Sequence, residues 1–267
     1  SFATLSEYIV LDSLFPDWNM WLEFDSSEPI TSLRRDSIDG VQAVQVEVKH
    51  PDEISTLFDG AIVYAKGARL LHMLRRYVGN DAFQAGLKQY FQDFAYQNTE
   101  ADDLWKAIAK SSGKDIVTIM NTWISQPGFP VVHMTRNGDQ VTLTQEQFFV
   151  GPHEPSDRLW PIPLNAGRDS APELMTEKTI TFTSPEPIRL NVEDTAHFIT
   201  HYDDETLAAI IDAFDELKPI DRQPLLNEAT LLTRAGVMSS AQLIPLIQAY
   251  ENETNEQVWG LISMAMA

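Results

Sequence analysis

The feature that most constrains the fold is a hydrophobic period that changes twice along the chain. Apolar residues recur at helical spacing to about residue 128, at strand spacing from there to about 202, and at helical spacing again to the end. Between the runs 131–134 and 141–144, Asn137-Gly138 predicts a β-hairpin with a type I′ turn. The pattern therefore predicts an α+β protein with three units, at residues 1–128, 129–202 and 203–267.

In the first unit, helix starts are expected where a capping residue precedes an apolar stripe. Asp81 and Asp115 are candidate N-caps, and Thr99 with Asp102 resembles a capping box. Pro127-Gly128 is expected to end the last of these helices. The unit is predicted to be helical, and its apolar stripes are core faces that require no ligand.

The second unit carries several short strand signals separated by turns rich in Pro and Gly. This number and spacing of strands predicts a small β-sandwich. The expected strands are at 131–134, 141–144, 162–164, 179–182, 188–192 and 197–199.

The third unit has short apolar stripes at helical spacing, which resemble the start of a helical-repeat array. Its last segment, 258–262, stops in mid-pattern, and Ser1 stands inside what reads as a helix. Truncation at both ends is the simplest expectation. Asp203 and its two acidic neighbours are expected to cap a helix.

Charge and composition exclude several classes of function. With 39 acidic and 19 basic residues the net charge is −20, which disfavours nucleic acid as a partner. The chain has no cysteine, so neither disulfides nor thiolate metal sites are available. No apolar run reaches the roughly 18 residues that span a bilayer. A cytoplasmic location is compatible with these observations.

One segment, residues 58–68, carries the chemistry that the sequence offers. It reads Phe-Asp-Gly-Ala-Ile-Val-Tyr-Ala-Lys-Gly-Ala, with Asp59 as a candidate N-cap just ahead of Tyr64. A phenol in such a place can donate a hydrogen bond to an oxyanion. Taken alone, Tyr64 is more readily a buried structural tyrosine. Gly67 and Ala68 leave a slim helix face on which another backbone can pack closely.

Together with Ser1-Phe2-Ala3, this segment resembles the M1 (gluzincin) zinc aminopeptidases, in particular aminopeptidase N-like members. That family has Asn-Glu-(Gly/Ser)-Phe-Ala, with a zinc-ligating Glu, and a Phe-Asp-x-Ile-x-Tyr-x-Lys-Gly-Ala stretch with the catalytic tyrosine. Further resemblance follows in the family's order along essentially the whole chain. It covers 33–37 (Leu-Arg-Arg-Asp-Ser), 50–54 (His-Pro-Asp-Glu-Ile), 123–130 (Trp-Ile-Ser-Gln-Pro-Gly-Phe-Pro) and 221–236.

The resemblance implies the C-terminal, helical half of a thermolysin-like catalytic domain, then a β-sandwich, then the first helices of an α-helical domain. It implies a parent that removes N-terminal residues from peptides with a free N-terminus. In that parent, zinc activates water and Tyr64 stabilises the tetrahedral intermediate. The ligand Glu is expected immediately before Ser1, outside the chain, so no zinc site and no activity are expected in this chain alone.

The chain also departs from the family pattern. His-Glu-x-x-His, which supplies two zinc ligands and the general base, does not occur, and neither does the Gly-x-Met-Glu-Asn substrate motif. At the end of the expected sandwich, Ile199 stands where the family has Arg. A role that depends on that Arg is therefore not expected in this chain.

The histidines offer no alternative metal site. His197 and His201 have the spacing of a helical metal pair, but they are expected in a strand, where residues four apart lie roughly 13 Å apart. His72 is expected to be a satisfied packing histidine, and His153 an exposed loop residue. A non-catalytic peptide- or protein-binding module from a metal-free relative stays open as a second interpretation, as does self-association through apolar surface exposed by truncation.

Overall fold

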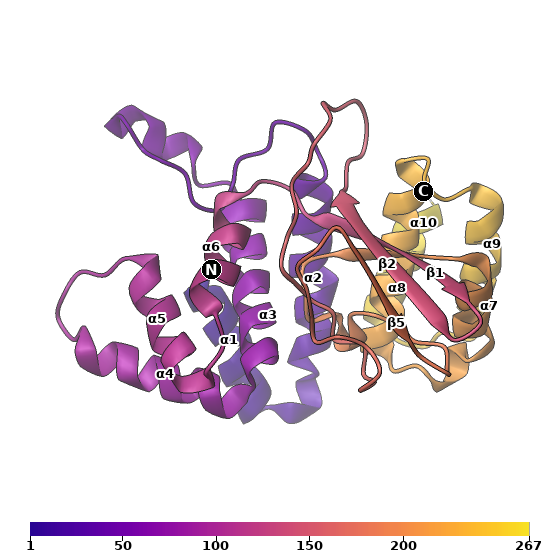
Figure 1. Ribbon diagram of the computed structural model, residues 1–267, viewed down its shortest axis with the longest axis horizontal. Helices are drawn as coiled ribbons and strands as arrows, with labels where there is room; N and C mark the ends of the chain where they lie inside the picture. Colours follow the sequence, from indigo (N-terminus) through magenta and orange to yellow (C-terminus); the bar gives the residue numbers. More distant parts are fainter. Residues whose placement is uncertain (267) are drawn as a thin grey trace.

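The computed structural model describes residues 1–266 and shows an α+β protein in which helices precede and follow the strands (Figure 1). The helices before the strands are α1 (Phe2–Leu14), α2 (Met20–Asp36), α3 (Gly67–Val78), α4 (Asn80–Asp93), α5 (Ala101–Ser112) and α6 (Ile116–Ser125). Short 3-10 helices lie at Pro16–Trp18 and Pro51–Thr56, and a π-helix at Gly60–Lys66 leads directly into α3.

The predicted helices form, but two of their starts are displaced. Helix α4 starts at Asn80, so Asp81 lies in the first turn and does not cap it. Helix α5 has a capping box one residue later than predicted, between Glu100 and Asp103. Asp115 caps α6 as expected, with its side chain accepting from the Thr118 amide. Each displaced start has a neighbouring residue that can act as the cap or supply the first-turn charge.

The middle segment forms two sheets. Four strands are arranged in the order β5-β2-β1-β6, with β1 parallel to β6 and the other pairs antiparallel, and β3 pairs with β4. The strands are β1 (Pro130–Asn137), β2 (Gln140–Gln147), β3 (Ile162–Pro163), β4 (Leu174–Met175), β5 (Thr179–Thr183) and β6 (Ile199–Tyr202). The strand predicted at 188–192 is absent from the described residues, because Asn191 has a positive φ of 53° and opens a 3-10 turn (Val192–Asp194).

The predicted hairpin forms, but its turn is of a different type. Asn137 pairs with Gln140, so Gly138 and Asp139 are the two central residues. Only Gly138 has a positive φ, of 59°. A type I′ turn needs a positive φ at both central positions, whereas a type II′ turn needs it at the first, where Gly stands here. The turn is therefore type II′.

The last segment is helical, as predicted. It comprises α7 (Asp204–Asp212), a 3-10 turn (Phe214–Glu216), α8 (Pro219–Arg234), α9 (Ser240–Ala249) and α10 (Glu256–Met266). Asp203 caps α7 by accepting from the Thr206 amide. Helix α8 contacts both β6 and α2, so it lies against the sheet and also reaches the first helices (Figure 1). Among the described helices, none has the length and apolarity needed to cross a membrane.

One hydrophobic core runs through the junction between the first helices and the sheet. Four large aromatic side chains are buried there: Trp123 on α6, Phe129 and Phe148 beside the sheet, and Trp160. The Trp123 indole nitrogen donates to the Pro161 carbonyl at 2.7 Å, which fixes α6 against the strand region. The buried side chains are therefore continuous across residue 128.

Candidate functional site

Tyr64 lies on the π-helix Gly60–Lys66, whose start is fixed as the sequence predicts. The Asp59 side chain accepts a hydrogen bond from the Ala61 amide at 2.9 Å, which caps the segment. π-Helical turns are rare in proteins, and those that occur are often found at functional sites. Tyr64 is 46% exposed, and no hydrogen bond of its hydroxyl to another residue is found within residues 1–266. It is therefore not a buried structural tyrosine, and its hydroxyl is free to bind a ligand.

The start of the chain packs directly on the helix that continues from Tyr64. A Cβ placed on Gly67 would lie 2.5 Å from the Ser1 Cβ, closer than real Cβ atoms come to one another. Gly67 thus allows the close approach that its small size predicts. Ser1 is the N-cap residue of α1, so the beginning of α1 and the residues around Tyr64 belong to one local structure.

Lys66, the last residue of the π-helix, belongs to a buried network of polar side chains. Lys66 Nζ lies 2.8 Å from Asp36 Oδ2 and donates to the Gly128 carbonyl at 2.9 Å. His197 Nε2 lies 3.1 Å from the same Asp36 oxygen, and the Gly128 amide donates to Asp36 Oδ1 at 2.9 Å. The side chains of Lys66, Asp36 and His197 are all 0% exposed. Both oxygens of Asp36 therefore have donors although no water reaches them.

The contacts of the network shift the pKa values of Asp36 and His197. Burial raises the pKa of Asp36, but the Lys66 charge and the hydrogen bonds from His197 and Lys66 outweigh it, and the net pKa is lowered. Burial lowers the pKa of His197 to about 4, against the opposing effect of Asp36. At neutral pH Asp36 is thus a carboxylate, and His197 is a neutral imidazole that donates Nε2–H to it.

A cavity of about 360 Å³ touches the Ser1–Gly67 contact. Most of its lining is apolar, and it includes Leu71, Trp105 and Met120. Tyr64 is not among its lining residues. The cavity therefore shares a helix with the predicted site residue, but the structure does not bring the two together in one pocket.

The histidines do not assemble a metal site. His201 in β6 pairs with His133, with their Nδ1 atoms 3.0 Å apart, whereas His197 faces Asp36. His72 packs against Trp21 and Phe24, as expected for a packing histidine. The prediction that its hydrogen bonds are satisfied is wrong, because its Nδ1 has no partner. Across residues 1–266, no three His, Cys, Asp or Glu side chains are placed to hold a metal ion together.

Sequence reasoning identified Tyr64, Asp59 and Gly67 but missed the network beneath them. Its members were visible in part, since Asp36 and Lys66 stand in segments that resemble family motifs. A lysine inside an otherwise apolar helical face was the available signal, because a buried Lys needs a charged partner.

Two family models match the chain. Residues 1–123 match the Peptidase family M1 domain, and residues 187–267 match the ERAP1-like C-terminal domain. These two matches include Ser1, the π-helix and the helices that follow the sheet.

Curated relatives agree with the family models. The chain is 43% identical to "Aminopeptidase N" of Lactococcus lactis subsp. lactis over 262 residues, which covers 95% of this chain and 31% of that protein. It is 41% identical to "Aminopeptidase N" of Lactobacillus helveticus, over 97% of this chain and 32% of the relative. It is 34% identical to "Tricorn protease-interacting factor F2" of Thermoplasma volcanium, over 97% of this chain and 33% of the relative. The chain thus spans about a third of the length of these relatives, and it belongs to the M1 peptidase family.

Proposed function

We propose that this chain is the part of a zinc aminopeptidase that supplies the oxyanion-stabilising tyrosine. The observation that carries the proposal is the exposed, unpartnered hydroxyl of Tyr64 on a capped π-helix. Relatives at 41–43% identity carry the name Aminopeptidase N, which supports a peptidase parent. The substrates we propose are peptides with a free N-terminus.

The chemistry assigned to Tyr64 is donation of one hydrogen bond. When water attacks a peptide carbonyl, negative charge develops on the carbonyl oxygen, and a phenol held in place stabilises that charge. A rigid support is needed, because the donor must be aimed before the charge forms. The Asp59 cap at the start of the π-helix and the buried Lys66 at its end provide such support.

The proposed zinc ion would activate the attacking water in the intact protein. Its ligands are expected outside this chain, beginning with a Glu immediately before Ser1. The contact between Ser1 and Gly67, three residues after Tyr64, supports this arrangement because a residue joined to Ser1 starts beside the tyrosine helix. This chain alone is expected to hydrolyse no peptide.

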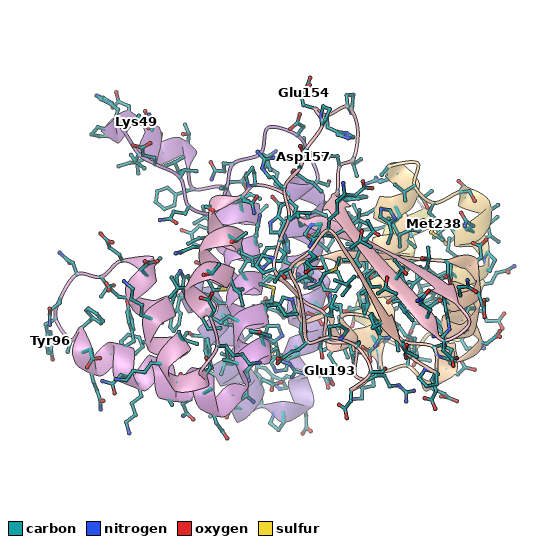
Figure 2. All side chains as sticks on the ribbon, viewed as in Figure 1. Lys49, Tyr96, Glu154, Asp157, Glu193 and Met238 are labelled. Atoms are coloured by element: carbon teal, nitrogen blue, oxygen red, sulfur yellow. The ribbon has the colours of Figure 1, made fainter. Side chains whose placement is uncertain are left out.

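The test is Tyr64→Phe in the full-length protein, with hydrolysis of an aminoacyl p-nitroanilide as the readout. Loss of one oxyanion donor should lower kcat by roughly 10²–10³-fold, with a much smaller change in KM. The matched control is Tyr96→Phe, because Tyr96 is fully exposed on the loop between α4 and α5 (Figure 2). The control should leave kcat unchanged.

Two results would contradict the proposal. Unchanged turnover in Tyr64→Phe would remove the tyrosine from the mechanism. A coding sequence that lacks a Glu codon before Ser1 and a His-Glu-x-x-His segment further upstream would favour the non-catalytic binding module. Sedimentation of the isolated chain would separately test self-association.

A further inference from the structure

The segment 33–37 resembles a family motif, but neither sequence nor proposed chemistry assigns it a task. In the structure it forms the last turn of α2, and its residues Arg35 and Asp36 reach the two ends of the π-helix. We propose that Asp36, together with Lys66 and His197, forms a positioning network that sets the direction of Tyr64. The inference rests on the proposed function of that tyrosine.

The first step of the argument is the geometry of the π-helix itself. Lys66 is fully buried, whereas Tyr64, two residues earlier, is 46% exposed. The two side chains therefore leave the helix on different faces. Fixing the Lys66 ammonium fixes the rotation of the helix about its axis, and this rotation decides where the Tyr64 ring points.

The second step is that consecutive residues of α2 hold both ends of the segment. Arg35 Nε lies 2.8 Å from Asp59 Oδ2 at the start, and Asp36 Oδ2 lies 2.8 Å from Lys66 Nζ at the end. The Arg35 side chain is 46% exposed, so solvent weakens its pair with Asp59. The buried pair between Asp36 and Lys66 is the stronger constraint of the two.

The third step is the connection to the strand region. His197 lies just before β6, and Gly128 lies just before β1. Both donate to Asp36, and the Gly128 carbonyl also accepts from Lys66. Asp36 and Lys66 thus both have partners from other parts of the fold, and these contacts restrict how the two side chains can lie relative to each other. A network of this kind specifies geometry because a displaced member would leave a buried charge unpaired.

The decisive experiment is a double-mutant cycle in the full-length protein, with Lys66→Met and Tyr64→Phe made alone and together. A residue that acts through Tyr64 loses its influence once the hydroxyl is gone. We expect Lys66→Met to lower kcat about 10-fold with KM within twofold. On the Tyr64→Phe background it should lower kcat less than twofold. An equal loss on both backgrounds would show a structural role and overturn the inference.

Lys66→Met leaves Asp36 without its cation, so circular dichroism must first show that the variant folds. His197→Gln is the second variant for the same cycle, because a Gln amide can donate to Asp36 and the ion pair stays intact. It should lower kcat about threefold on the wild-type background and not on the Tyr64→Phe background. An equal loss on both would again overturn the inference.

A readout without activity separates this inference from the proposed function. The chain is labelled with 3-fluorotyrosine, and the Tyr64 signal in the ¹⁹F NMR spectrum is assigned by its absence in Tyr64→Phe. His197→Gln should shift or broaden that signal, whereas Lys49→Met, at an exposed site (Figure 2), should not. Unchanged turnover in Tyr64→Phe with a shifted signal would reject the proposed function alone. An unmoved signal in every folded variant would reject the positioning network.

Discussion

Asp36 and Glu228 are two buried carboxylates that meet the same stretch of chain around β6, from opposite parts of the fold. Asp36, at the end of α2, lies beside the Lys66 ammonium and accepts from His197 and the Gly128 amide. Glu228, on α8, accepts from the Thr200 amide at 3.1 Å, and within residues 1–266 no cation lies within salt-bridge distance of it. One carboxylate has a full set of charged and polar donors, and the other has a single amide.

The difference appears in their ionisation. The pKa of Asp36 is lowered although burial acts to raise it, because Lys66 and the hydrogen bonds outweigh burial. Burial and the charge of Asp194 raise the pKa of Glu228 to about 8, against the Thr200 amide and two arginines. Burial alone therefore does not decide whether a carboxylate is charged, because its donors do. Around Asp36, an ion pair and hydrogen bonds hold the side chains near the Tyr64 helix in place. Around Glu228, where α8 contacts β6, the raised pKa favours the neutral carboxylic acid.

The largest expected effect concerns Glu228. A group with a raised folded pKa binds its proton more tightly in the native state, so its contribution to stability is present below pH 4.5 and is lost as pH rises towards 8. The full loss is about 5 kcal/mol by the difference in pKa. In Glu228→Gln this decline should disappear. Urea unfolding at pH 5 and pH 8.5 measures it, and parallel declines in both proteins would refute the assignment.

The next effect concerns Lys66. Removing one partner of a buried ion pair leaves an uncompensated charge, so Lys66→Met should lower the free energy of unfolding by about 3–5 kcal/mol. The double variant Asp36→Asn with Lys66→Met should regain part of this loss, because the unpaired charge is gone. Lys49→Met, at a side chain that is 74% exposed, should change stability by less than about 0.5 kcal/mol. Urea denaturation midpoints compare the three, and a double variant no better than the single one would argue against the charge explanation.

Sequence reasoning reached the local part of this arrangement. Asp59 was expected as a cap and Gly67 as a close-packing residue, because both depend on neighbours within a few positions. Helix starts shifted by one residue where two adjacent side chains compete, as at Thr99 and Glu100. The hairpin was found, but its turn type was wrong since one step in register decides which residues are central.

The network of Asp36, Lys66 and His197 could not be predicted from local sequence patterns. Asp36 and His197 are 161 positions apart, and no local pattern indicates that they meet. The π-helix also escaped prediction, since its apolar spacing resembles that of an α-helix. What the sequence does offer is a lysine at a position that the helical pattern buries, and such a residue indicates an unseen partner.

A smaller effect follows from His197 and has the opposite sign to that of Glu228. Its folded pKa is lowered, chiefly by burial, so the native state binds fewer protons than the unfolded state between pH 6.5 and 4. Stability should fall by about 3 kcal/mol as pH falls through this range. His197→Gln should remove that fall. Thermal unfolding at pH 7 and pH 4.5 measures it, and an equal acid loss in variant and wild type would assign the loss to other groups.

The smallest expected effect tests whether polar groups at the α8 interface contribute to stability. Gln223 lies on α8, is 1% exposed, and neither its amide nitrogen nor its carbonyl oxygen has a partner among the described residues. Burying a polar group without hydrogen bonds costs free energy, and a Met side chain of similar shape removes that cost. Gln223→Met should therefore leave stability unchanged or raise it by about 1 kcal/mol, in contrast to the loss in Lys66→Met. Urea denaturation compares the two. A loss above about 2 kcal/mol in Gln223→Met would show that the amide has partners in solution, and the contrast between the two interfaces would not hold.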